Sequence, residues 1–103
     1  MNTIPYSTRR EVYKQAQRQF GITNQTVVGI EELSELAKEL CKFIRYPHST
    51  EFPRLAEEMA DVTIMLEQLK QFYGLDDEVD SWVDFKVSRL QETIMEAQKN
   101  AEE

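Results

Sequence analysis

Two acidic motifs hold the side chains of this sequence whose types and spacing could do chemistry. The motif EELSEL at 31–36 is echoed twenty-six residues later by EEMADV at 57–62. Each copy places two carboxylates three residues apart, in the pairs Glu32/Glu35 and Glu58/Asp61. Residues three apart on an α-helix lie on nearly the same face, so each pair can point at one object.

Two such helices packed together would bring the four carboxylates into a small volume. Like charges at close range repel, and each disfavours the ionised form of its neighbour. A cation at the centre removes this conflict, and hard divalent cations take carboxylate oxygens as ligands. The motifs therefore predict a site for Mg²⁺, with Mn²⁺ as the alternative, in which the four acids are the metal ligands.

The positions of these four acids around their helices support the assignment as metal ligands to different degrees. At about 100° per residue, Glu58 falls inside the apolar arc of its helix, Asp61 lies just beyond the edge, and Glu32 borders the arc of the earlier helix. Glu35 is favoured over Glu31 only by its spacing to Glu32, and the role of Glu31 is left open. A charged residue that faces a core is costly unless it is paired or liganded. Solvated positions are expected for Glu31, Glu39 and Glu57.

Two cationic residues nearer the C-terminus also lie on or beside the apolar side of their predicted helix. Lys86 falls inside an apolar arc and Arg89 at its edge. They could neutralise the carboxylates of neighbouring helices as ion pairs, or they could hold phosphate oxygens while the carboxylates hold metal. Phase alone does not separate these alternatives.

The elements that must position these residues are four predicted helices. Their approximate ranges are 7–20, 23–45, 53–74 and 77–98, followed by a polar tail at about 99–103 that is expected to fray. Ser7 and Thr23 are plausible N-caps, Pro53 suits a first helical turn, and Gly21 and Gly74 suit helix ends. Short connections favour antiparallel neighbours. The fold class is all-α, a four-helix bundle-like domain.

The predicted second helix has a regular apolar stripe that is expected to face the core. Its members follow a 3,4,3,4 spacing: Ile30, Leu33, Ala37, Leu40 and Ile44.

Composition sets further bounds. The 103 residues make one domain, 1–103, and the net charge of −7 argues against binding a nucleic-acid backbone. No long apolar run suggests a membrane segment, and the protein is expected to be cytoplasmic. Cys41 is the only cysteine and is expected to be a buried free thiol. His48 is the only histidine and falls in a turn, which disfavours zinc and di-iron sites.

Taken with their helical context, the motifs Glu31-Glu32-x-x-Glu35 and Glu58-x-x-Asp61 resemble those of the MazG-like all-α nucleoside triphosphate pyrophosphohydrolases, in particular the short, single-domain, phage-type members. The resemblance spans about 24–90. It implies that Glu32, Glu35, Glu58 and Asp61 bind the metal and are the catalytic residues. Many members carry a Lys and an Arg on the fourth helix that meet the substrate phosphates, which here correspond to Lys86 and Arg89. An Asn often found near that Lys is not evident, and Asp84 lies close by instead.

The resemblance also implies a function and an assembly. A nucleoside triphosphate, NTP or dNTP, would be hydrolysed to the monophosphate and pyrophosphate, and the substrate cleft would be completed in a homodimer or homotetramer. Two other functions stay open: a non-catalytic helical interaction module and a domain that senses nucleotide without turning it over. Neither the base nor the sugar of the substrate follows from the sequence.

Overall fold

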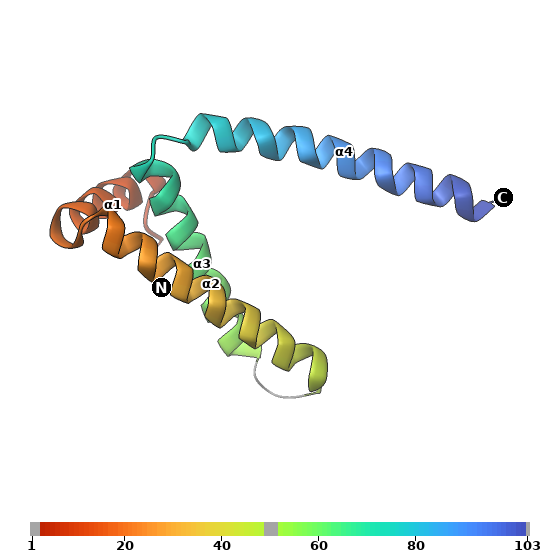
Figure 1. The fold of residues 1–103 in the computed structure, drawn as a ribbon, viewed down its shortest axis with the longest axis horizontal. Coiled ribbons are helices and arrows are strands. Elements are labelled where there is room, and N and C mark those ends of the chain that lie inside the picture. The colour runs from red at the N-terminus through yellow and green to blue at the C-terminus, as the bar shows by residue number, and fades with distance from the viewer. Residues whose placement is uncertain (1–2, 49–51, 103) are drawn as a thin grey trace.

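A computed structural model describes residues 3–48 and 52–102 of the chain. Within these ranges the chain forms four α-helices and no strand, which confirms the all-α class (Figure 1). The helices are α1 (Tyr6–Phe20), α2 (Ile22–Arg45), α3 (Phe52–Phe72) and α4 (Asp76–Glu102).

An antiparallel hairpin of α2 and α3 forms the body of the molecule, and α1 packs beside it (Figure 1). Gly29 lets the two helices approach closely, because a Cβ at this position would lie 3.3 Å from Leu69 Cδ1. Tyr13 of α1 and two residues of α3, Val62 and Met65, are the buried apolar side chains among the described residues. The core is therefore small and centred on α3.

The fourth helix leaves this body. Among the described elements, the backbone of α4 comes close only to that of α3, and beyond an Arg10–Asp76 ion pair at its first residue α4 runs away from the hairpin rather than back along it (Figure 1). None of its described residues is buried. The radius of gyration is 17.7 Å, whereas a compact domain of this length is expected to have one of about 13 Å.

Two glycines end helices as the sequence predicts. Gly21, with φ of 86°, separates α1 from α2, and Gly74, with φ of 66°, follows α3. After α3, Leu75 N donates to Lys70 O at 2.8 Å and Gly74 N donates to Gln71 O at 3.3 Å. These two bonds form a Schellman motif, in which a residue with positive φ closes the last helical turn.

The predicted N-caps are wrong. Ser7 and Thr23 lie inside their helices, because Pro5 and Gly21 occupy the cap positions. The third helix begins at Phe52, next to the predicted Pro53.

The predicted core-facing stripe of α2 is exposed to solvent. Instead, α2 turns a neighbouring stripe toward α3, whose members are buried or half-buried: Gly29, Glu32, Leu36, Glu39 and Phe43. The prediction ranked the faces of α2 by apolar content, whereas within one chain α3 packs on the face that holds the small Gly29.

Three smaller expectations are also wrong. Glu39 is not solvated but buried, 6% exposed, and it accepts a hydrogen bond from Lys42 Nζ at 3.5 Å. Cys41 is free but exposed, because it lies beside the uncovered stripe of α2. The tail does not fray where it is described, since α4 continues to Glu102, while residue 103 lies outside the described residues.

No helix of the described chain combines the length and the apolar character that a membrane span requires.

Candidate metal centre

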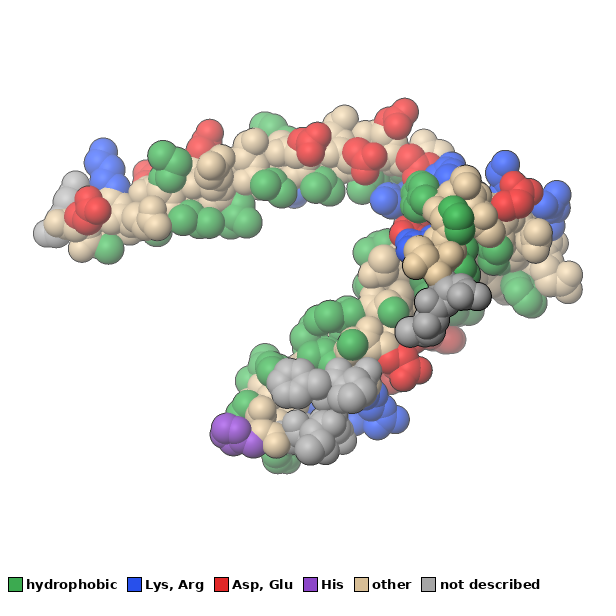
Figure 2. Space-filling view, turned by 180° about the vertical axis from the view of Figure 1, so that it is seen from behind, with side chains coloured by type: hydrophobic (Ala, Val, Ile, Leu, Met, Phe, Trp, Pro, Cys, Tyr) green, Lys and Arg blue, Asp and Glu red, His purple; other side chains and the backbone are tan. Residues whose placement is uncertain are grey.

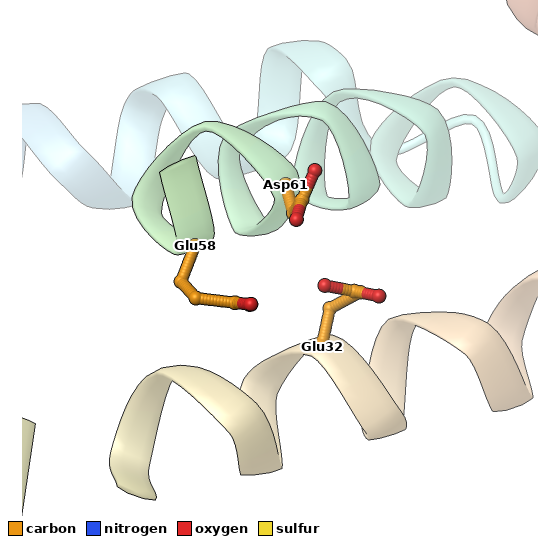
Figure 3. A group of neighbouring side chains, drawn as sticks. All are labelled: Glu32, Glu58 and Asp61. Atoms are coloured by element: carbon orange, nitrogen blue, oxygen red, sulfur yellow. The ribbon is translucent and has the colours of Figure 1, made fainter. Parts of the chain in front are cut away.

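The hairpin brings carboxylates of the two acidic motifs together. Because α2 and α3 run antiparallel, Glu32 lies opposite Glu58 and Asp61, and the three side chains point toward one another (Figure 3). One oxygen from each residue lies within 4.8 Å of the others, and all three residues are half-buried. The structure thus assembles three of the four acids that the sequence predicts as metal ligands.

Burial and charge both act on this group. Burial raises the pKa of Glu32 above its usual value, and the neighbouring carboxylates of Asp61 and Glu58 raise it further. Each cause disfavours a negative charge on Glu32. One oxygen of Glu58, Oε2, is buried and has no hydrogen-bond partner among the described residues. Buried polar oxygens normally have a partner, so this atom has an unmet need for a donor or a cation.

The donor set suits a small hard cation. Mg²⁺ takes oxygen ligands at about 2.1 Å, so opposite ligands of an octahedral ion lie about 4 Å apart. The 4.8 Å limit on the group's oxygens is close to this span, and a small side-chain adjustment could close the difference. Among the described residues, histidine and cysteine are absent from this group, and its all-oxygen chemistry favours Mg²⁺ or Mn²⁺ over zinc.

The other acids of the motifs lie outside the group. Glu35 is exposed, one turn along α2 from Glu32, and the structure does not bring it to the other three. Glu31 and Glu57 are exposed, as expected for both residues, and for Glu57 the helical phase predicts it. The role of Glu35 as a ligand stays a prediction.

Lys86 and Arg89 lie on the part of α4 that leaves the hairpin, and both are exposed. Among the described residues, neither cation makes an ion pair with a carboxylate. Lys86 instead borders an apolar groove of about 350 Å³ on α4, which is lined by Val79, Trp82, Val83, Lys86, Val87 and Leu90. The ion-pair alternative for Lys86 thus has no support within one chain.

The structure also reveals polar contacts between α1 and α3 that the sequence did not predict. Glu67 of α3 accepts hydrogen bonds from Tyr13 Oη and from Arg9 Nη1, the latter at 3.0 Å. Burial and the Glu67 carboxylate raise the pKa of Tyr13. The residues involved are more than fifty positions apart, and no local spacing reveals such a pairing.

A polar hollow of about 500 Å³ lies where α1, α3 and α4 meet. Across it, Arg10 Nη1 donates to Asp76 Oδ1 at 3.4 Å, which links α1 to the start of α4. Its lining residues are Tyr6, Arg10, Lys70, Gly74, Asp76, Asp77 and Asp80.

Aromatic side chains that could stack on a nucleobase differ in their exposure to solvent. Tyr13 is buried, and its hydroxyl donates a hydrogen bond to the Glu67 carboxylate. Trp82 is 55% exposed and meets Phe85 edge to face, with ring centroids 5.9 Å apart. Trp82 and Phe85 therefore form an exposed aromatic surface on the same helix as Lys86.

No protein-family model, curated protein or solved structure matches this chain. The resemblance to the MazG-like enzymes therefore stays a prediction from the two motifs.

Proposed function

We propose that the protein is a metal-dependent hydrolase that converts a nucleoside triphosphate, NTP or dNTP, to the nucleoside monophosphate and pyrophosphate. The observation that carries the proposal is the meeting of Glu32, Glu58 and Asp61, whose oxygens lie within 4.8 Å of one another between two helices. The residues come from both motifs on which the MazG-like resemblance depends. A cytoplasmic enzyme is part of the same proposal.

The three carboxylates would hold Mg²⁺, or Mn²⁺. When bound, such an ion supplies a Lewis acid for the phosphate oxygens and acidifies a water molecule. The side chains contribute charge and position: Glu58 and Asp61 are fixed on adjacent turns of α3, and Glu32 faces them from α2. Glu35 remains a candidate fourth ligand.

Lys86 and Arg89 are the proposed phosphate contacts. Both are exposed and neither is paired with an acid within the described chain, so their charges are available to an anion. The groove beside Lys86 and the exposed ring of Trp82 add an apolar surface next to these cations. Because α4 leaves the hairpin that holds the acids, the proposal includes a homodimer or homotetramer in which acids and cations of different subunits form one cleft.

The decisive experiment is an assay for pyrophosphate release with a panel of NTPs and dNTPs and with Mg²⁺. Wild-type protein should release pyrophosphate from at least one nucleotide only when the metal is present. Glu58→Gln should lower the rate by about 100-fold or more, because it removes a charged ligand at nearly constant shape. Glu57→Gln is the matched control: its side chain is exposed on the same helix, and its rate should stay near wild type.

Full activity of Glu58→Gln would contradict the assignment of the metal site. Both variants should give the circular dichroism spectrum of the wild type. This control excludes unfolding as the cause of a loss of activity.

A non-catalytic interaction module is the second candidate, and the exposed apolar surface of α4 favours it. A thermal melt with and without Mg²⁺ separates the two, because an ion that binds only the folded state raises the melting temperature by mass action. A nucleotide sensor would show the metal effect and bind nucleotide, yet release no pyrophosphate.

A further inference from the structure

The surface area of the chain is too large for a compact monomer of its mass. The structure exposes 8458 Å², whereas a folded monomer of 12.1 kDa is expected to expose about 6000 Å². The difference of about 2400 Å² exceeds the roughly 800 Å² that each partner contributes to a standard protein–protein interface. The molecule therefore has ample uncovered surface for a stable interface.

One part of this surface is the apolar stripe of α2, formed by Ile30, Leu33, Ala37, Leu40 and Ile44. Every member is exposed, and Ile30 and Ile44 are exposed by 58% and 77%. The stripe that faces α3 carries two glutamates, Glu32 and Glu39, whereas the exposed stripe carries no polar residue. The more hydrophobic side of α2 is thus the side that its own chain leaves uncovered.

The order of side chains in the stripe fits a copy of itself. It reads Ile-Leu-Ala-Leu-Ile in either direction, with the small Ala37 at the middle. The 3,4,3,4 spacing is that of a helix seam that packs against another helix. Two-fold symmetric interfaces use the same patch on both partners, so a stripe with this order can meet itself in antiparallel orientation.

Charges beside the stripe favour the same orientation. Glu31 flanks one end and Arg45 the other, on the same side of the helix, and both are exposed. An antiparallel pair places Glu31 on the same flank of the seam as Arg45 of the second copy, whereas a parallel pair places the two copies of each residue on opposite flanks and offers no such pairing. Opposite charges that face each other across an interface help to fix its register.

We propose that the α2 stripe is the interface with a second copy of this chain, in which two α2 helices pack antiparallel about Ala37. The stripe lies away from α3, so this pairing leaves the site of Glu32, Glu58 and Asp61 uncovered. The interface does not depend on the proposed catalytic function, and a protein without pyrophosphohydrolase activity would still form it.

Sedimentation equilibrium of the full chain tests the interface, with Leu33→Glu compared to Leu90→Glu. Both leucines are exposed within one chain, by 46% on α2 and 56% on α4. The wild type should be a dimer or a pair of dimers at micromolar concentration. Leu33→Glu should raise the dimer dissociation constant by at least about 100-fold, because it buries a charge at the seam, while Leu90→Glu should change it by less than threefold.

A monomeric wild type would overturn the proposal. So would a dimer that resists Leu33→Glu, or one that is lost equally in both variants, because the interface would then involve α4. Circular dichroism checks that each variant keeps its helices.

Disulfide cross-linking tests the orientation independently, in a Cys41→Ser background. A mixture of Ile30→Cys and Ile44→Cys chains should form a cross-linked dimer of the two species, whereas neither variant should cross-link to itself. Self-linked Ile30→Cys would indicate a parallel pair, and a dimer without any cross-link would place its interface elsewhere; either result overturns the proposal.

Discussion

The α2–α3 hairpin and α4 are built from similar amphipathic helices, yet they lie in opposite environments. In the hairpin, α3 buries Val62 and Met65, and the two helices enclose a group of carboxylates. The apolar residues of α4 face solvent, and Figure 2 shows them along the lower edge of the α4 arm. The inner sides of α2 and α3 cover each other within one chain, although the outer stripe of α2 stays exposed, whereas the described part of the chain does not cover the apolar side of α4.

This difference shows what an amphipathic pattern specifies. Periodicity identifies the side of a helix that prefers to leave water, but it does not identify the element that covers that side. The apolar side of a helix can be covered by other parts of its own chain, as in α3, or by another molecule. Long helices are stabilised mainly by tertiary packing, so the uncovered side of α4 matters for its stability.

The largest expected difference between the two regions concerns core packing. Met65 is 6% exposed in the hairpin and Met95 is 61% exposed on α4, so alanine at each gives a matched pair. Met65→Ala should lower the free energy of unfolding by about 2–5 kcal/mol through cavity formation, and Met95→Ala should change it by less than about 0.5 kcal/mol. Urea unfolding measures both. A large loss for Met95→Ala would show that α4 is covered in solution and would remove the contrast.

A second prediction assigns different ligands to the two regions, metal to the hairpin and phosphate to α4. Lys86→Met should weaken nucleotide binding at saturating Mg²⁺ by more than about tenfold, or roughly 1.4 kcal/mol, while metal binding persists. Methionine keeps much of the apolar stem of lysine, so the packing near Trp82 should be retained. Lys99→Met, exposed on the same helix, is the control. Unchanged affinity in calorimetric titration would return Lys86 to a structural role.

The smallest effect is expected in the pH dependence of the hairpin's stability without metal. The raised pKa of Glu32 means that the folded state holds its proton more tightly than the unfolded state. Its contribution to stability is therefore fully present below the usual value of 4.5 and is lost as the pH rises through the higher folded pKa. Glu32→Gln should remove this loss, so the variant should gain stability relative to wild type at pH 7 but not at pH 4.

Thermal melts in metal-free buffer at the two pH values measure this difference, with Glu57→Gln as the control. Added Mg²⁺ should reverse the order at pH 7, because an ion that binds the carboxylates stabilises only the wild type fully. If Glu32→Gln and wild type show the same pH profile, the carboxylates do not interact in the folded protein.

The sequence predicted the helices and the approach of Glu32, Glu58 and Asp61 because both follow from local patterns. Gly21 and Gly74 end helices through their positive φ, and the i,i+3 spacing of Glu58 and Asp61 places them on one side of α3. The start of a helix was less predictable. Ser7 and Thr23 have good capping side chains, but the helices begin before them.

What the sequence could not supply is the choice of partner for each helix face. The apolar stripe of α2 was expected in the core, yet α3 packs on the adjacent side, where Gly29 permits close contact. That rotation also explains why Glu39 is buried and Cys41 exposed. The positions of Lys86 and Arg89 relative to the acids were uncertain for the same reason. Their helical phase places them inside or at the edge of the apolar arc, but the direction of α4 depends on the turn that precedes it.

Because the turn at Gly74 sets the direction of α4, a change in the backbone angles of this residue would rotate the whole helix about it. The helix has 27 residues, which at 1.5 Å each give an arm of about 40 Å. A change of about 10° at the pivot would move the far end by about 7 Å and Lys86, ten residues along, by nearly 3 Å, with the helix itself staying straight. The φ of 66° at Gly74 is one that a side chain disfavours. A single backbone conformation thus governs where the cations of α4 point, at a distance from every residue that would carry out the chemistry.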